Sequence, residues 1–169
     1  RQPAGQRAEV ILADGTHVWL NSRSTLKFSE QFSANTRNVE LDGEGYFSVQ
    51  HNEKSPFTVQ TPKYTIQVLG TEFNVKAYHN SPLFETALIK GSVEITSPEL
   101  SQSLRLKPDE IAVANNGRLE TSHISDYNYF KWKEGLFCFE NESIQDLIDK
   151  LQLYYDIQID VQRPSLLQY

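Results

Sequence analysis

Apolar and polar residues alternate through the stretch from Asn38 to Val75, and this alternation constrains the fold more than any other feature of the chain. A period of two places one row of a strand's side chains in a core and the other row outside it. The apolar runs are short, and residues that favour turns separate them: Asp42-Gly43, Asn52 to Pro56, Thr61-Pro62 and Gly70-Thr71. The stretch therefore predicts a series of short strands, which the rest of the chain extends.

Short strands are also expected on both sides of this stretch. Val10 to Leu12 and His17 to Leu20 flank Asp14-Gly15, a pair that strongly favours a hairpin turn. More short apolar runs separated by turn residues follow from Thr86 onwards. Because no helical period interrupts them, we predict a mainly β fold over residues 9–121: a two-sheet β-sandwich, a barrel or a flattened β-solenoid.

The pattern changes in the last quarter of the chain. Ser143 and Asp146 have the spacing of a capping box, and the apolar residues after them recur with a helical period: Ile144, Leu147, Ile148, Leu151 and Tyr155. Leu136 to Phe139 before this helix and Ile157 to Val161 after it alternate like strands. We therefore expect a small α+β, βαβ-like module at the C-terminus.

These patterns divide the chain into four parts. Residues 1–8 are expected to be a disordered leader, 9–121 an all-β domain, 122–131 a linker and 132–169 the βαβ-like module. The module is too small to fold alone and has no further partner strand, so we expect it to be truncated or completed by another chain.

Composition excludes several classes of function. The 169 residues are 38% hydrophobic, which is typical of a soluble globular protein, and no stretch has the apolar length of a membrane-spanning helix. Sixteen basic and twenty-two acidic residues give a net charge of -6 without a basic cluster, so nucleic acid and anionic membrane surfaces are poor partners. The chain has no Met, even at position 1, which implies that an N-terminal part has been removed.

No catalytic, cofactor or metal site is expected from the sequence. Known short signatures of nucleophiles, phosphate loops and metal sites are absent. The four histidines lie far apart without partners at metal-ligand spacing: His17, His51, His79 and His123. Cys138 is the single cysteine, so an intrachain disulfide is impossible, and an inert, half-buried thiol is the simplest interpretation.

Three further residues allow a functional and a structural interpretation. Glu44 lies between two glycines and could be a general base, but a local hydrogen bond or salt bridge beside a glycine bulge is favoured. Trp19 and Trp132 could stack on a sugar or peptide, although core or edge positions are commoner for tryptophan.

Several motifs, taken in order, resemble the FecR family of transmembrane anti-sigma regulators. L-x-D-G-x-x-V-x-L-N-x-x-S begins at Leu12 and R-x-V-x-L-x-G-E-x-x-F-x-V at Arg37, and P-F-x-V, V-L-G-T-E-F-N-V and G-S-V follow. Next, L-x-P-x-E and W-K-E-G-L-F-C-F resemble the C-terminal module of such regulators, which is similar to the short N-terminal domain of secretins and TonB-dependent receptors. The chain departs from the family pattern at two turn or bend positions, with Gly45 in place of Ala and Asp109 in place of Gly.

The resemblance implies the periplasmic region of a single-pass inner-membrane protein. Such a protein receives a signal from the signalling domain of a TonB-dependent outer-membrane transporter, in iron or other nutrient uptake. It controls an extracytoplasmic-function sigma factor through a cytoplasmic segment that is absent here, and the membrane helix upstream is also absent. The function expected is therefore signal transduction and transcription regulation, not enzymatic activity.

On this interpretation the β domain is a scaffold, and a strand edge of the C-terminal module offers main-chain pairing to the partner. The expected contact residues are Phe137, Phe139, Ile157 and Ile159. The alternative is a periplasmic or secreted β-sandwich that binds carbohydrate through a surface platform made by Trp19, Tyr46 or Trp132.

Overall fold

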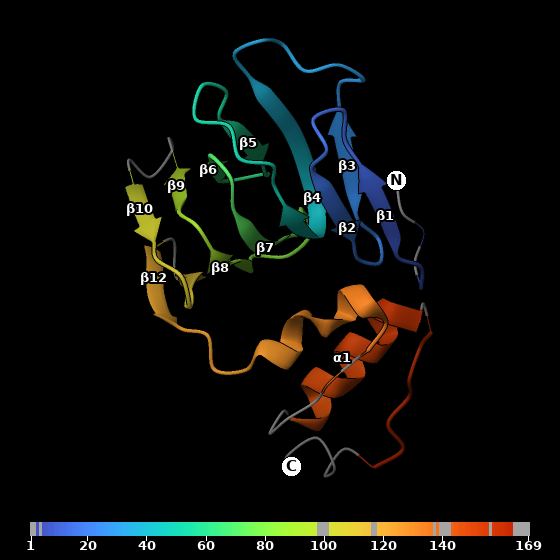
Figure 1. Cartoon of the computed structure of the whole chain (residues 1–169). Helices are drawn as coiled ribbons and strands as arrows, with labels where there is room; N and C mark the ends of the chain where they lie inside the picture. Colours follow the sequence, from blue (N-terminus) through green and yellow to red (C-terminus); the bar gives the residue numbers. More distant parts are fainter. Residues whose placement is uncertain are drawn as a thin grey trace.

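The computed structural model describes residues 3, 5–97, 102–115, 118–136, 138, 143–155 and 157–163. Twelve strands, one 3-10 helix and one α-helix occupy this part of the chain, and Figure 1 shows their arrangement. The elements are β1 (Ala8–Ile11), β2 (His17–Leu20), β3 (Thr25–Phe28), β4 (Arg37–Ser48), β5 (Phe57–Gln60), β6 (Thr65–Val68), β7 (Glu72–Ala77), β8 (Phe84–Lys90), β9 (Val93–Ser97), β10 (Gln102–Leu106), β11 (Glu110–Asn115), β12 (Arg118–His123), η1 (Tyr127–Glu134) and α1 (Ile144–Tyr155).

The strands form two layers that share one long strand. The layer that we call sheet A has the order β1-β2-β4-β7-β8-β11-β12, and sheet B has the order β3-β4-β5-β6-β9-β10. The first half of β4 pairs with β3 and β5 in sheet B, and its second half, from Gly43, pairs with β2 and β7 in sheet A. The mainly β fold predicted from the alternation is therefore confirmed.

Gly43 is the point at which β4 leaves one sheet for the other. Its φ of +127° is in a region that other residues rarely adopt, and a Cβ there would lie 2.3 Å from Ser24 Oγ. The glycine thus allows both the bend and the close approach of the loop before β3.

The main core lies between the two sheets. Alternate residues of each strand enter it, as the period of two requires: from β4, for example, Val39, Leu41 and Phe47 are buried there. A second, smaller cluster lies on the outer face of sheet A, where Phe130 and Trp132 of η1 cover Tyr46 and Ala87. Sheet A is therefore covered on both faces.

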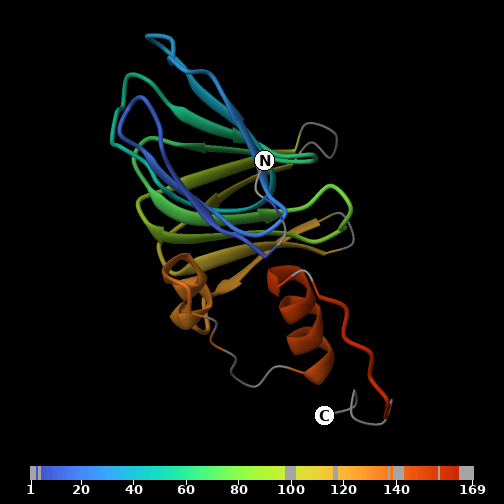
Figure 2. The ribbon, with the colours of Figure 1, turned by 90° about the vertical axis from the view of Figure 1, so that its right-hand side faces the viewer.

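The helical segments lie together on one side of the β body (Figures 1 and 2). The predicted helix is confirmed as α1, and its start is capped as expected, because Ser143 Oγ accepts a hydrogen bond from the backbone N of Asp146 at 3.1 Å. The segment expected as a linker instead contains the end of β12 and part of η1, since burial of Phe130 and Trp132 fixes a local helical turn. The division into domains itself stays a prediction.

The prediction of a second strand in the C-terminal module is wrong. Residues 157–161 are described and lie outside any strand. The backbone N of Ile159 donates instead to Oε1 of Gln152 on α1, at 2.9 Å. Alternation indicates a possible strand but cannot show which neighbour the segment has, and here a side chain of α1 lies beside it.

Candidate partner-binding surface

The expected contact residues have different positions in the structure. Phe137 and Phe139 lie outside the described residues. Ile157 is 49% exposed, whereas Ile159 is partly buried. Because residues 157–161 form no strand, the strand edge expected there is absent, although Ile157 remains available to a partner.

Other apolar side chains of the C-terminal segment, by which we mean the described residues after η1, are also exposed. Leu136 is 54% exposed and Tyr155 55% exposed, values close to that of Ile157. Neither Leu136 nor Tyr155 was among the expected contact residues. For Tyr155, its position at the end of the helical apolar stripe was a sequence signal that could have pointed to it. The C-terminal segment thus offers several apolar side chains to the outside.

The 3-10 helix η1 fastens the beginning of this segment to sheet A. The side chain of Asp126 caps η1 by accepting from the backbone N of Asn128 at 2.8 Å, and Gly135 ends it in the left-handed conformation. Arg7 Nη1 donates to the backbone O of Trp132 at 2.5 Å, so the N-terminal segment also contacts η1.

The aromatic platform of the carbohydrate-binding alternative is not present. Tyr46 and Trp132 are 3% and 1% exposed, because η1 packs over sheet A, and Trp19 is only partly exposed. Lys133 Nζ lies 3.8 Å from the ring centroid of Tyr46 and 5.5 Å from that of Trp19. Burial above all, together with Glu72, raises the pKa of Tyr46 to about 12.

Glu44 is the centre of a buried polar network. Its carboxylate is fully buried and accepts from Asn21 Nδ2 at 2.8 Å, Asn74 Nδ2 at 3.1 Å and the Tyr129 hydroxyl at 3.3 Å. Ser24 Oγ accepts from its backbone N at 2.9 Å. Glu44 therefore makes hydrogen bonds, as favoured from the sequence, but not local ones: its partners lie 23, 30 and 85 residues away. The network joins the loop after β2, sheet A and η1.

A row of charges crosses the outer face of sheet A beside this network. Glu44 on β4, Lys76 on β7 and Glu85 on β8 lie directly opposite one another in the register of the strands. Burial raises the pKa of the Glu85 carboxyl, and Lys76 and Lys150, which oppose this shift, offset it only in part. Burial and the nearby carboxylates of Glu44 and Glu85 also raise the pKa of Tyr129.

A groove of about 400 Å³ opens next to this row, between η1 and strands β8, β11 and β12. Its wall includes Glu85, Tyr129 and Phe130, with apolar side chains of β11 and Cys138. Cys138 is a free, partly buried cysteine, which agrees with the half-buried position expected from the sequence.

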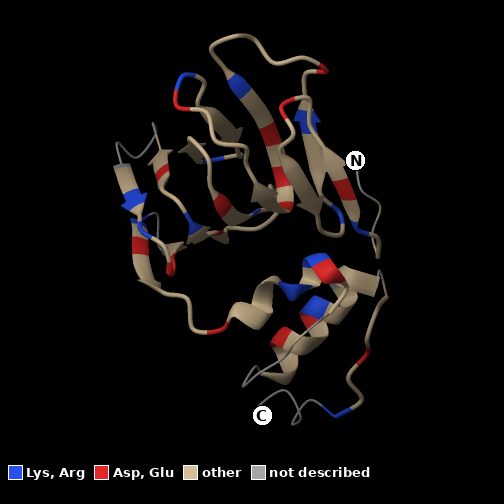
Figure 3. Cartoon of the chain, viewed as in Figure 1, with Lys and Arg blue, Asp and Glu red and all other residues tan. Residues whose placement is uncertain are grey.

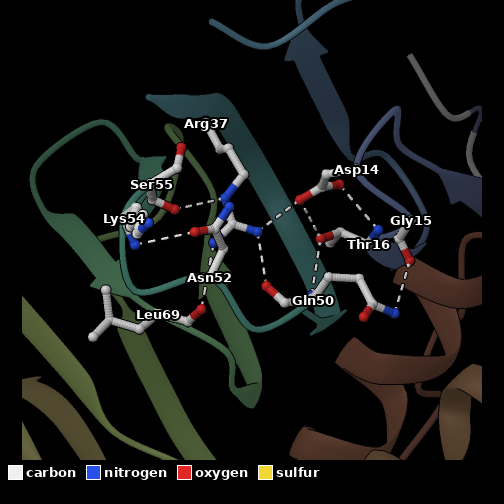
Figure 4. A network of polar contacts seen from close by, with 9 residues as sticks. All are labelled: Asp14, Gly15, Thr16, Arg37, Gln50, Asn52, Lys54, Ser55 and Leu69. Carbon is white, nitrogen blue, oxygen red and sulfur yellow. Dashed lines mark hydrogen bonds and ion pairs between the residues drawn. The ribbon is translucent and has the colours of Figure 1, made fainter. Parts of the chain in front are cut away.

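A second buried network surrounds Arg37 at the start of β4 (Figure 4). Its guanidinium donates to Asp14 Oδ2 and to the backbone O of Gln50 and Ser55, each at 2.8 Å, and reaches the backbone O of Leu69 at 3.4 Å. Burial by itself raises the pKa of Asp14, but hydrogen bonds from Arg37 and Thr16 outweigh it and hold that pKa below its usual value. The sequence marked Arg37 and Asp14 as motif positions, but not as partners.

Three of the histidines lie beside single carboxylates. His17, His51 and His79 each lie near one carboxylate, of Glu9, Glu53 and Asp42 respectively. No group of three His, Cys, Asp or Glu side chains within the described ranges is placed to hold a metal ion. Acidic and basic positions are interspersed in the view of Figure 3. Among the residues whose structure is described, none belongs to a helix with the length and apolarity needed to cross a membrane.

Comparisons with known proteins identify relatives of this arrangement. The profile of the family described as "FecR protein" matches residues 1–94. Two crystal structures of a "putative anti-sigma factor" from Parabacteroides distasonis ATCC 8503, at 1.65 and 2.50 Å resolution, are 32% identical to the chain with a TM-score of 0.83. The match covers 92% of this chain and 73% of the other. A comparison with curated proteins gives no match.

Proposed function

Because this chain belongs to the FecR family, we propose that it is the periplasmic receiver of an anti-sigma regulator anchored in the inner membrane. The receiver binds the signalling domain of a TonB-dependent outer-membrane transporter, and the regulator in turn controls an extracytoplasmic-function sigma factor. The observation that carries this proposal is the 32% identity to the P. distasonis protein over 92% of the chain. Because it covers 92% of the chain, this match must extend past residue 94, where the family profile ends.

The hydrogen bonds of the polar motif residues agree with a role in binding and not in catalysis. Glu44 and Arg37 have their hydrogen-bonding groups occupied within the fold, at the junctions between strands, loops and η1. Such residues hold a scaffold in shape and leave recognition to exposed groups. We therefore propose that the chain is not an enzyme.

The C-terminal segment supports the proposal by offering exposed apolar side chains to a partner. Leu136, Tyr155 and Ile157 are each about half exposed on a segment that η1 fastens to the β body. Contacts of this kind give most of their free energy through a few residues that become fully buried in the complex. Ile157 is the member of the expected contact set that the structure shows to be exposed.

We expect Ile157→Asp, introduced into the full-length regulator, to reduce the response of a sigma-dependent reporter to the transporter's signal by about tenfold. A buried carboxylate without a partner would oppose the contact. Ile11→Asp is the matched control, because Ile11 is 62% exposed on β1 and remote in sequence from the segment. Equal responses of the two variants would exclude Ile157 from the contact, and a reporter that ignores the transporter in the unmodified protein would exclude the receiver role.

A further inference from the structure

The described residues at the start of the chain contact three other parts of the fold. We call residues 3 and 5–7 the N-terminal strap, and Figure 1 shows the start of the chain beside the end of α1. The backbone N of Arg23, in the loop after β2, donates to the backbone O of Pro3 at 3.5 Å. A Cβ on Gly5 would lie 3.3 Å from the backbone O of Tyr154, at the end of α1. The strap therefore lies against both the loop and the helix.

Ser22 joins the strap to α1 from a fixed position. Its Oγ lies 3.3 Å from the backbone O of Gln6 and 3.4 Å from that of Tyr154, so one hydroxyl serves both carbonyl groups. The side chain of Asn21 accepts from the backbone N of Ser22 at 2.8 Å, and the Tyr78 hydroxyl donates to its backbone O at 3.0 Å. Ser22 is 1% exposed, and Asn21 belongs to the buried network described above. Groups attached to sheet A thus hold the Ser22 hydroxyl in place.

Arg7 joins the strap to the end of η1. Besides its hydrogen bond to Trp132, the guanidinium lies against Gly135, where an added Cβ would be 2.8 Å from Nη2. A cation at this position complements the carbonyl groups at the end of a helix. Ala8 then begins β1, which pairs with β2. The strap therefore connects the ends of two helical segments to an edge of sheet A.

The strap touches the ends of the elements that carry the candidate partner-binding surface. Tyr155 and Leu136 are each about half exposed. The backbone C of Tyr155 would lie 3.4 Å from the added Cβ of Gly5, and Leu136 directly follows Gly135. One side chain thus belongs to α1 and the other follows η1. A partner that contacts both needs these two ends held together, and the strap contacts both ends.

We propose that the N-terminal strap couples the partner-binding surface to the start of the chain. The strap and the ends of α1 and η1 dock together at the loop after β2, so release of one loosens the others. A partner that requires Leu136 and Tyr155 in their docked positions favours docking of the strap. Because such coupling is reciprocal, release of the strap weakens the partner's binding by the same factor. The coupling within the chain stands by itself, whereas its use by the transporter rests on the proposed function.

Hydrogen exchange of the whole chain, followed by mass spectrometry, tests the effect of the strap on α1. Gly5→Val places a branched side chain at a φ of +69° and against Tyr154, so the strap should leave its site. We expect exchange in α1 to become at least about 5-fold faster, and Ser22→Ala to speed it by about 2- to 5-fold through the lost hydroxyl. Gly15→Val is the matched control, because its φ is +81° but its Cβ would contact the Gln50 side chain. That control should leave exchange in α1 unchanged.

Trypsin tests the reverse direction, because the bond after Arg7 lies at the end of the strap. Asp149→Pro should break α1, since Asp149 is exposed within the helix and proline removes a backbone donor there. We expect the product that begins at Ala8 to form at least about 5-fold faster than from the unmodified protein, as measured by mass spectrometry. Asp149→Ala, which preserves the helix, should not change this rate.

Unchanged exchange in α1 of Gly5→Val, or an unchanged rate of cleavage in Asp149→Pro, would overturn the coupling. A second arm adds the transporter's signalling domain to the unmodified chain and to Gly5→Val. We expect the domain to slow cleavage after Arg7 and to bind Gly5→Val about 5-fold more weakly. Absence of binding to the unmodified chain would reject the receiver role and leave the coupling within the chain standing. Equal affinity for the two chains would overturn the use of the strap by the partner.

Discussion

Replacing Arg37 with methionine is expected to lower the free energy of unfolding by about 3–5 kcal/mol. The side chain is 3% exposed and connects the Asp14 turn, the start of β4 and the segment from Gln50 to Ser55. Methionine keeps much of the apolar volume over Phe57 but removes every donor. The backbone O of Gln50 and Ser55 would then lose the guanidinium donors, and Asp14 would lose its cation while keeping the hydrogen bonds from Thr16. Desolvated polar groups without partners are costly.

Urea denaturation measures this loss, and two variants define its origin. Asp14→Asn in the Arg37→Met background should recover part of the stability, because it removes the uncompensated charge. Arg105→Met is the control: that side chain is exposed and lies 3.7 Å from Glu94, so a change within about 0.5 kcal/mol is expected. If Arg37→Met were no worse than Arg105→Met, the buried network would not stabilise the fold.

The same network predicts the pH dependence. The pKa of Asp14 is lower in the folded protein than its ordinary value of 3.8. Its contribution is therefore complete above the unfolded pKa and is lost as the pH falls through the lower, folded value. Below about pH 4, the unmodified protein should lose this part of its stability, and Arg37→Met should not.

Gly43→Ala is expected to cost about 3 kcal/mol or more. The new Cβ would lie 2.3 Å from Ser24 Oγ and 2.6 Å from Ser24 Cα, so the backbone of the preceding loop must move. The φ of +127° adds strain that alanine cannot relieve without altering the bend between the sheets. The effect should appear as a lower urea midpoint with an unchanged slope.

Gly15→Ala separates crowding from backbone strain. Gly15 also has a positive φ, +81°, but a Cβ there would contact only the Gln50 side chain, at 3.4 Å or more. We expect a cost of about 1 kcal/mol at this position. Adding Ser24→Gly to Gly43→Ala should recover little stability, because the Cα of residue 24 remains in place. Equal costs at the two glycines would contradict the close approach at Gly43.

The sequence was sufficient to predict the strands of the two β layers, because alternation and turn residues are local signals. The Asp14-Gly15 hairpin, the runs within Asn38 to Val75 and the helix after Ser143 follow from patterns a few residues long. Asp109 also fits this logic, since its φ of +72° explains why glycine is the family's usual residue there.

Long-range pairing could not be predicted in the same way. That β4 serves both sheets, and pairs in parallel with β5, depends on contacts between distant segments. The partners of Arg37 and Glu44 likewise come from turns, loops and η1 that no short pattern relates. The error at Ile157 to Val161 has the same cause, because alternation indicates a possible strand but not a neighbour with which it can pair.

The most direct test of the receiver role is calorimetric titration of the purified chain with the signalling domain of the transporter encoded beside it. An unrelated transporter's signalling domain is the control. We predict saturable binding to the first domain and none to the second. Absence of binding to a folded, correctly paired domain would contradict the proposed function.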